Sequence, residues 1–247
     1  MRIFFSLPIS LLFIFGVVLT ACTATQSLGE SSIISPDKDD SETGWQEEFD
    51  LSKCTLSTQG SSEYFILEPG FQLVLEGGNE RLVITVLDET IEIDGTQTRV
   101  VEEREWRNGE LIEASRNFFS ICEQTEDVFY YGEEVDMYSG GQLASHNGAW
   151  RAGEDNARPG LIMPGKPAVG MKYYQEIAPG VAMDRAEVLS LDQLFKTPAG
   201  DFPNSLNTQE GTALNLLEKE FKTYAPETGL IQDQKLLLIE YGFIENE

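Results

Sequence analysis

Acidic side chains are the residues of this sequence best suited to chemistry. Of its 247 residues, 42 are Asp or Glu and 17 are Lys or Arg, which gives a formal net charge of −25. Carboxylate oxygens bind Ca²⁺, and two carboxylates at the right separation can hydrolyse a glycosidic bond. Four acidic residues lie within or beside one Gly- and Pro-rich region and are the candidates for either role: Glu133, Glu134, Asp136 and Asp184.

Three interpretations of these four carboxylates stay open. They are ligands of a structural Ca²⁺, the catalytic pair of a carboxylate-dependent glycoside hydrolase, or part of a solvated acidic surface. The sequence contains no twelve-residue calcium loop, and acidic residues are frequent throughout the chain, so the solvated surface is favoured. Apart from Ca²⁺, no cofactor is expected.

Other enzyme classes lack their characteristic residues. His146 is the single histidine, and no nucleophile motif accompanies it in its Gly-, Ser- and Asn-rich stretch. Zinc sites usually take several His or Cys ligands, and phosphate sites often use a glycine-rich loop between a strand and a helix; the sequence has neither pattern. The negative net charge repels nucleic acid. We therefore expect a non-enzymatic protein that does not bind nucleic acid.

The N-terminus carries an export signal. Arg2 precedes an apolar run, residues 3–18, that is too short to be a membrane span and is followed by Leu19-Thr20-Ala21-Cys22. These four residues resemble the lipobox of bacterial lipoproteins. The resemblance implies that Cys22 becomes the first mature residue and that acyl chains on it, palmitate among them, anchor the protein to a membrane. Thr23, in place of an aspartate, implies the periplasmic face of the outer membrane in a Gram-negative cell. The alternative is a cleaved secretory peptide with an ordinary Cys22.

Two further cysteines, Cys54 and Cys122, belong to the folded part of the chain. An exported protein folds in oxidising surroundings, so these two are predicted to form a disulfide. Two free buried thiols are the alternative, because a sequence does not supply the geometry that a disulfide needs.

The chain divides into a tether and a β-rich domain. After the signal peptide, residues 1–21, residues 22–52 are rich in Ser, Thr, Asp and Glu and are predicted to form a flexible acidic tether. Trp45 and Phe49 are expected to begin docking onto the domain. The single β-rich domain, residues 53–247, is predicted to comprise a first meander in 53–131, a loop-rich region in 132–183 and a second meander in 184–247.

Turn signals separate short β-rich runs in both meanders. Asp94-Gly95 and Asn108-Gly109 are favoured two-residue hairpin turns. Residues 214–220 have a composition that suits a helix, but they are predicted to be a strand because their neighbours are strands. The pattern predicts an all-β fold in which antiparallel meanders form a curved sheet or half-open barrel with a long Gly/Pro-rich irregular insertion. The predicted strands are 71–76, 81–87, 98–106, 111–119, 128–131, 188–195, 202–209, 216–224 and 236–243.

Large aromatic and apolar side chains punctuate the loop-rich region and its borders. Long loops of this kind are usually functional or cover a site. The candidates for contact with a ligand are Tyr130, Tyr131, Trp150, Met163 and Tyr174. The expected function is that of a membrane-anchored extracytoplasmic lipoprotein that binds an envelope protein or an apolar ligand.

Several stretches of the chain resemble known bacterial sequences. They are residues 93–101, 128–136, 148–153, 159–164, 174–176, 179–182 and 224–230. Together they resemble a group of uncharacterised bacterial exported proteins and lipoproteins, over about residues 65–231, and this resemblance implies no activity. The closing strand and turn pattern is also similar to that of periplasmic half-open barrels of the lipoprotein-carrier type.

Overall fold

Residues 44–244 are the part of the chain that the computed structural model describes. The predicted signal peptide, Cys22 and the tether up to residue 43 lie outside it, so the predictions made for them stay predictions. Within residues 44–244 nearly all regular structure is β-strand, with one short 3₁₀-helix and no α-helix. The all-β prediction is confirmed.

Turn residues with left-handed backbones separate many of the strands. Both predicted two-residue turns form, with φ of 47° at Asp94 and 74° at Gly95, and of 55° at Asn108 and 79° at Gly109. The elements are η2 (Leu51–Lys53), β1 (Leu56–Ser57), β2 (Gly60–Ser62), β3 (Phe65–Leu67), β4 (Phe71–Gly77), β5 (Glu80–Ile93), β6 (Thr96–Arg107), β7 (Glu110–Cys122), β8 (Val128–Ser139), β9 (Gln142–Ser145), β10 (Trp150–Arg151), β11 (Gly160–Met163), β12 (Lys172–Tyr174), β13 (Asp184–Thr197), β14 (Gly200–Thr212), β15 (Asn215–Ala225), β16 (Gly229–Asp233) and β17 (Leu236–Phe243).

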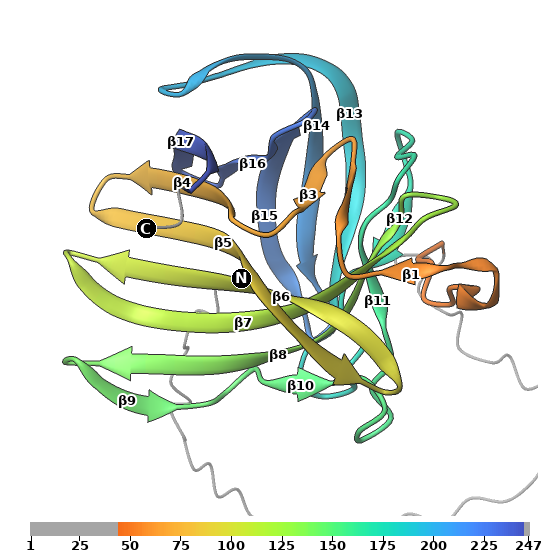
Figure 1. The fold of residues 1–247 in the computed structure, drawn as a ribbon. Helices are drawn as coiled ribbons and strands as arrows, with labels where there is room; N and C mark the ends of the chain where they lie inside the picture. Colours follow the sequence, from red (N-terminus) through yellow and green to blue (C-terminus); the bar gives the residue numbers. More distant parts are fainter. Residues whose placement is uncertain (1–43, 245–247) are drawn as a thin grey trace, which may run out of the picture. The chain divides into compact units, whose positions relative to one another are not determined.

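Fifteen of the strands in residues 44–244 form one curved, open sheet (Figure 1). Its order is β10-β8-β7-β6-β5-β4-β17-β16-β15-β14-β13-β12, while β1, β9 and β11 add to β7 or β8 beside this path. The two predicted meanders therefore join edge to edge where β4 pairs with β17, from Phe71 opposite Phe243 to Glu76 opposite Leu237. All strand pairs within the sheet are antiparallel, as the hairpin turns predicted.

Some predicted boundaries were wrong. The predicted strand 81–87 is part of one longer strand, β5, which covers residues 80–93 with a register shift between Val86 and Thr90. Strand β8 continues to Ser139, so the irregular region begins later than residue 132. The interpretation of 214–220 as strand is confirmed, because β15 covers most of it.

The predicted tether boundary at residue 52 was also too late. The Gln46 N–H donates to the Lys172 carbonyl oxygen over 2.9 Å, and Gln46 thereby lies beside β12. Trp45 stacks on the Arg185 guanidinium, 4.4 Å from the ring centroid, and Phe49 contacts Phe129 edge to face. The expected docking of Trp45 and Phe49 is confirmed, and these contacts hold residues 44–52 against the domain.

The irregular insertion forms a seam between distant strands of the sheet. Strands β10 and β11 pair with β8, whereas β12 pairs with β13. The Arg158 N–H donates to the Ile177 carbonyl oxygen over 2.9 Å and links the two groups. A Cβ atom added at Gly160 would overlap the Gln175 carbonyl oxygen, so only glycine allows this close backbone approach. We call residues 150–184 the seam.

Replacing Gly160 by Ala is expected to destabilise the protein by about 2 kcal/mol or more, because the added methyl group must push β11 away from Gln175. Thermal unfolding followed by circular dichroism measures the loss. Gly140→Ala is the control, since nothing lies within 4 Å of an added Cβ there and only its left-handed φ of 57° is strained. Equal losses in both variants would show that the close approach at Gly160 is unimportant.

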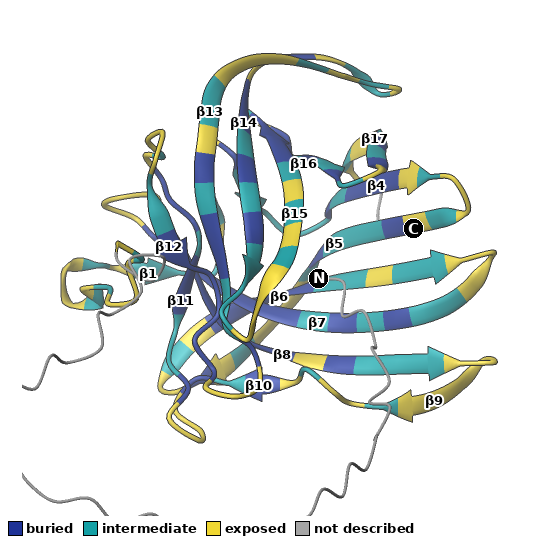
Figure 2. Cartoon of the chain, turned by 180° about the vertical axis from the view of Figure 1, so that it is seen from behind, coloured by how far each residue is buried: buried dark blue, intermediate teal, exposed yellow. Residues whose placement is uncertain are grey.

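One hydrophobic core connects both meanders. Buried positions alternate with more exposed ones along β14 and β16, as a two-residue period requires (Figure 2). Phe118 and Val100 of the first meander and Leu206, Ile231 and Leu238 of the second are fully buried members of one cluster. Each such side chain stabilises the fold by about 1.5–3 kcal/mol.

Candidate functional site

Carboxylates from both meanders share the inner face of the sheet. Residues opposite each other on neighbouring strands project to the same side. In the first meander, Val101, Asn117 and Glu133 form one such row. In the second meander, Ala186, Glu210 and Glu220 form another. The two rows face a common interior, because Val101 and Ala186 belong to one buried hydrophobic cluster.

Glu133, Glu176 and Asp184 form a cluster at the seam, which we call the seam carboxylates. Glu133 lies on β8 opposite Trp150 of β10. Asp184 begins β13 and lies opposite Thr212. Glu176 follows β12, and its N–H donates to the Asp184 carbonyl oxygen over 3.1 Å. Backbone pairing therefore fixes all three positions, although they come from three separate segments.

Two of the seam carboxylates, Glu133 and Glu176, are deeply buried and incompletely bonded, whereas Asp184 is half-buried. Glu133 is 2% exposed and Glu176 is 4% exposed. Glu133 Oε1 and Glu176 Oε2 have no hydrogen-bond partner. Burial, together with the neighbouring carboxylates Glu113, Glu103 and Asp184, raises the pKa of Glu133 to about 8. Burial and nearby carboxylates also raise the pKa of Glu176 and of Asp184.

A second buried network, on β14 to β16, contains its own cation, Lys222. Lys222 Nζ lies 3.1 Å from Glu210 Oε2, and Glu210 Oε1 accepts from the Tyr224 hydroxyl over 3.0 Å and from Thr208 over 2.9 Å. Burial opposes the charge on Lys222, but Glu210 and Asp233 outweigh it and raise the Lys222 pKa. This network is built around the ion pair between Lys222 and Glu210.

The five predicted ligand-contacting residues are all buried side chains. Met163 is 1% exposed, and the four aromatic residues are at most 8% exposed. The Tyr130 ring lies 5.4 Å from that of Trp150, and the Tyr130 hydroxyl donates to Asn117 Oδ1. Tyr174 lies edge to face with Trp45. In this conformation Tyr130, Tyr131, Trp150, Met163 and Tyr174 pack within the domain, and their contact with a ligand stays a prediction.

The structure brings together two of the four predicted carboxylates. Alternation along β8 places Glu133 inside and Glu134 on the opposite face, where Glu134 pairs with Arg151. Asp136 also lies on the opposite face, 2.9 Å from His146 Nδ1, and the His146 side chain is 65% exposed. Of the four, Glu133 and Asp184 influence each other electrostatically. Among residues 44–244 no group of three or more His, Cys, Asp or Glu is arranged to hold a metal ion.

Glu176 completes the cluster, and sequence reasoning missed its role. It lies in a short irregular segment, so no strand periodicity pointed to its orientation. The available signal was an acidic residue directly after Tyr173-Tyr174-Gln175 and before Ile177. A charged residue inside an apolar run is more often buried than its type suggests, and buried carboxylates have raised pKa values.

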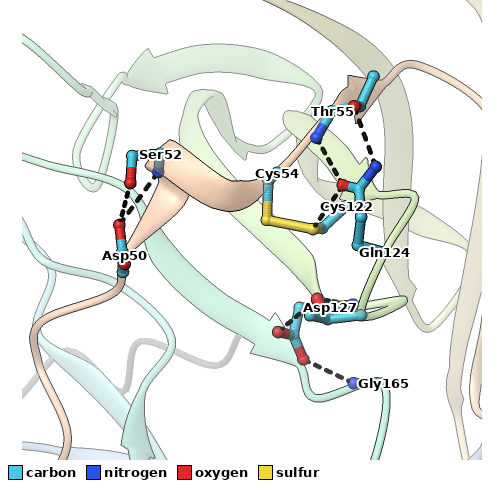
Figure 3. Close-up of a disulfide and its surroundings, with 9 residues drawn as sticks. Asp50, Ser52, Cys54, Thr55, Cys122, Gln124, Asp127 and Gly165 are labelled. Atoms are coloured by element: carbon cyan, nitrogen blue, oxygen red, sulfur yellow. Dashed lines mark hydrogen bonds between the residues drawn. A yellow bond between two sulfur atoms is a disulfide. The ribbon is translucent and has the colours of Figure 1, made fainter.

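The predicted disulfide between Cys54 and Cys122 is confirmed, with a Cα–Cα distance of 5.1 Å (Figure 3). It ties the segment that enters the domain to the end of β7. Beside it, Gln124 accepts a hydrogen bond from the Thr55 N–H over 2.6 Å and donates to the Thr55 hydroxyl over 3.0 Å (Figure 3). The loop after β7 is anchored further where Asp127 Oδ1 accepts from the Gly165 N–H over 2.9 Å.

The fold and the site together define an all-β domain with an open antiparallel sheet and a buried acidic cluster at its seam. No family model, no curated protein and no solved structure matches the chain. No helix in the described part of the chain is long and apolar enough to cross a membrane.

Proposed function

We propose that the protein is a membrane-anchored extracytoplasmic binding protein whose ligand contacts the carboxylate-bearing interior at the seam. The observation that carries the proposal is the set of buried oxygens without partners on Glu133 and Glu176. Leaving such groups unpaired costs about 1–3 kcal/mol each, so a core selected for stability alone would contain apolar residues there. Carboxylates with strongly raised pKa values concentrate at functional sites.

Export and anchoring rest on the N-terminal sequence and on the disulfide. The apolar run that ends in Leu19-Thr20-Ala21-Cys22 supports lipid attachment at Cys22. The Cys54–Cys122 disulfide supports an oxidising compartment. Tyr130, Trp150 and Tyr174 are buried side chains. An envelope protein or an apolar ligand that contacts them must first displace the residues packed against them at the seam. The proposed contact surface is therefore the interior of the domain rather than an exposed loop.

Glycoside hydrolysis is the alternative function, because Glu133 and Asp184 do share a site and Glu133 is protonated at neutral pH. A protonated glutamate can act as a general acid. Hydrolysis also needs an ionised carboxylate as the second catalytic group, and burial raises the pKa of Asp184 as well as that of Glu133. Binding is therefore the better supported function.

Immobilised protein comprising residues 44–247 is expected to capture an envelope component, and the double variant Glu133→Gln, Glu176→Gln is expected to lose at least about nine-tenths of that capture. Mass spectrometry of the eluted material, with quantification against the unsubstituted protein, measures the loss. Glu134→Gln is the matched control, since Glu134 lies on the other face of the same strand. Equal capture by the double variant and the control would rule out the interior as the contact surface.

A further inference from the structure

We propose that the tip of the β14–β15 hairpin inserts into the surface of a lipid bilayer and so determines which end of the domain faces the membrane. This inference rests on the membrane anchoring in the proposed function and adds the part of the domain that contacts lipid. It follows from the residues at the tip, from their exposure and from the place where the predicted tether reaches the domain.

Apolar residues occupy the tip of the β14–β15 hairpin, at a place where hairpins usually carry polar residues. Ala213-Leu214 joins the two strands, and Leu216 and Leu217 follow at the start of β15. Gly, Asn and Asp are the usual turn residues, because they tolerate a left-handed backbone or bond to the backbone. Apart from Pro198-Ala199, the other two-residue turns between paired strands in the described chain consist of glycine and polar residues: Gly78-Asn79, Asp94-Gly95, Asn108-Gly109, Gly140-Gly141 and Gln234-Lys235. We call residues 213–217 the apolar tip.

The leucines of the apolar tip project into solvent from a bonded backbone. Leu217 is 92% exposed, Leu214 is 53% exposed and Leu216 is 50% exposed (Figure 2). The Leu214 N–H donates to the Thr212 hydroxyl over 3.3 Å, and the Leu217 N–H donates to Asn215 Oδ1 over 3.2 Å. A single exposed leucine on a protein surface is ordinary, whereas several together indicate a surface that contacts a partner or a membrane.

The described chain begins beside the strands that carry the apolar tip. Trp45 stacks on Arg185 of β13. Arg185 lies opposite Gly211 of β14, and the next residue of β14, Thr212, lies opposite Asn215 across the tip. The segment that follows the predicted tether therefore docks one residue of strand register away from the hairpin end.

The predicted anchor is close enough in sequence to bring the apolar tip to a membrane. With Cys22 lipidated, residues 22–43 separate the anchor from the described domain. A chain of that length has a root-mean-square end-to-end distance of about 25 Å. The anchor therefore keeps the bilayer at a high effective concentration near the domain, and a weak apolar contact suffices to orient it.

A bilayer suits the apolar tip better than a second protein does. A stable protein interface buries about 800 Å² on each partner. A hairpin end with three exposed leucines offers only part of that area. Insertion among acyl chains removes each leucine from water without requiring a complementary shape. The formal net charge of −25 repels anionic headgroups, so the lipid partner is zwitterionic.

Fluorescence quenching of the full-length lipidated protein in phosphatidylcholine vesicles tests the proposal. The variant Leu214→Cys carries a polarity-sensitive dye on its thiol, and quenching groups are placed either on the lipid acyl chains or in the water as iodide. We expect the acyl-chain quencher to reach the dye and iodide not to reach it. Adding Leu217→Ser should lower the ratio of inserted to free tip by about tenfold or more, because the most exposed leucine no longer gains from leaving water.

Leu194 provides the matched control, because it is 59% exposed but lies far along β13 from Asp184, the residue opposite Thr212. A dye on Leu194→Cys should be quenched by iodide and not by the acyl-chain quencher. Leu194→Ser should leave the inserted ratio of the Leu214→Cys dye unchanged. Urea unfolding confirms that each variant is folded.

The possible results separate the apolar tip from the anchor. Equal quenching of the dyes at positions 214 and 194 would overturn the proposal. Protection of the dye at position 214 from both quenchers would also overturn it, because a second copy of the chain or another protein would then cover the tip. A lipidated protein whose dye at position 214 stays in water contradicts the tip alone, whereas an intact mass with unmodified Cys22 contradicts the anchoring and this inference with it.

Discussion

Removing the disulfide by the double substitution Cys54→Ala, Cys122→Ala is expected to lower the free energy of unfolding by about 4 kcal/mol. The two cysteines are 68 residues apart in sequence. A crosslink that closes a loop of this length restricts the unfolded chain, and the chain-entropy model assigns about 4 kcal/mol to the restriction. Urea unfolding of residues 44–247, followed by tryptophan fluorescence, measures the difference.

A reducing agent supplies the control for this experiment. It should destabilise the unsubstituted protein and leave the double variant unchanged, since the variant has no crosslink to lose. If the crosslink stabilises the protein by restricting the unfolded chain, the hydrogen bonds between Thr55 and Gln124 beside it should persist in both folded proteins. Unfolding midpoints that coincide with and without the crosslink would contradict the chain-entropy account for this loop.

The sequence predicted local features of the fold well. The turns at Asp94-Gly95 and Asn108-Gly109 depend on residues that tolerate a left-handed backbone, which is a local property. Strand β17 has the predicted bounds because Leu and Ile residues fill it between turn residues. The disulfide also followed from residue count and compartment alone.

The seam could not be predicted because its pairing is non-local. The Gly- and Pro-rich composition of the insertion indicated loops and a possible cover over a site. In the folded chain its backbone instead pairs with β8, and Arg158 is linked to Ile177 nineteen residues later. Glycine is required at position 160 because its backbone lies against the Gln175 carbonyl oxygen. Nothing in the sequence around Gly160 reveals that contact.

The candidate site was half predicted for a similar reason. Residue type singled out Glu133 and Asp184, but only strand register shows that Glu133 faces inward while Glu134 forms an ion pair with Arg151 on the other face. Glu176 lies outside any regular strand, so periodicity carries no information about it. The aromatic candidates were identified as large apolar side chains, and the same property that suits ligand contact also suits core packing.

The seam carboxylates make stability depend on pH in an unusual direction. The pKa of Glu133 is about 8 in the folded protein against an ordinary value of 4.5, because burial disfavours the charged carboxylate. Between these two pH values the folded protein binds more protons than the unfolded chain, so the free energy of unfolding falls as pH rises. Below about pH 4.5 Glu133 is protonated in both the folded and the unfolded protein. Above about pH 8 the full loss of unfolding free energy due to Glu133 has accumulated.

Glu133→Gln is therefore expected to be more stable than the unsubstituted protein at pH 9 and no more stable at pH 5. The difference between the two pKa values corresponds to at most about 5 kcal/mol, which an uncharged amide does not lose as pH rises. Urea unfolding at a series of pH values from 5 to 9 measures the slope. Glu134→Gln, on the opposite face and paired with Arg151, should retain the slope of the unsubstituted protein. A protein whose stability rises between pH 5 and 8, or a Glu133→Gln variant with an unchanged slope, would mean that Glu133 is charged and solvated in the folded state. This pH dependence requires a buried Glu133 carboxyl group that keeps its proton at neutral pH in the folded protein.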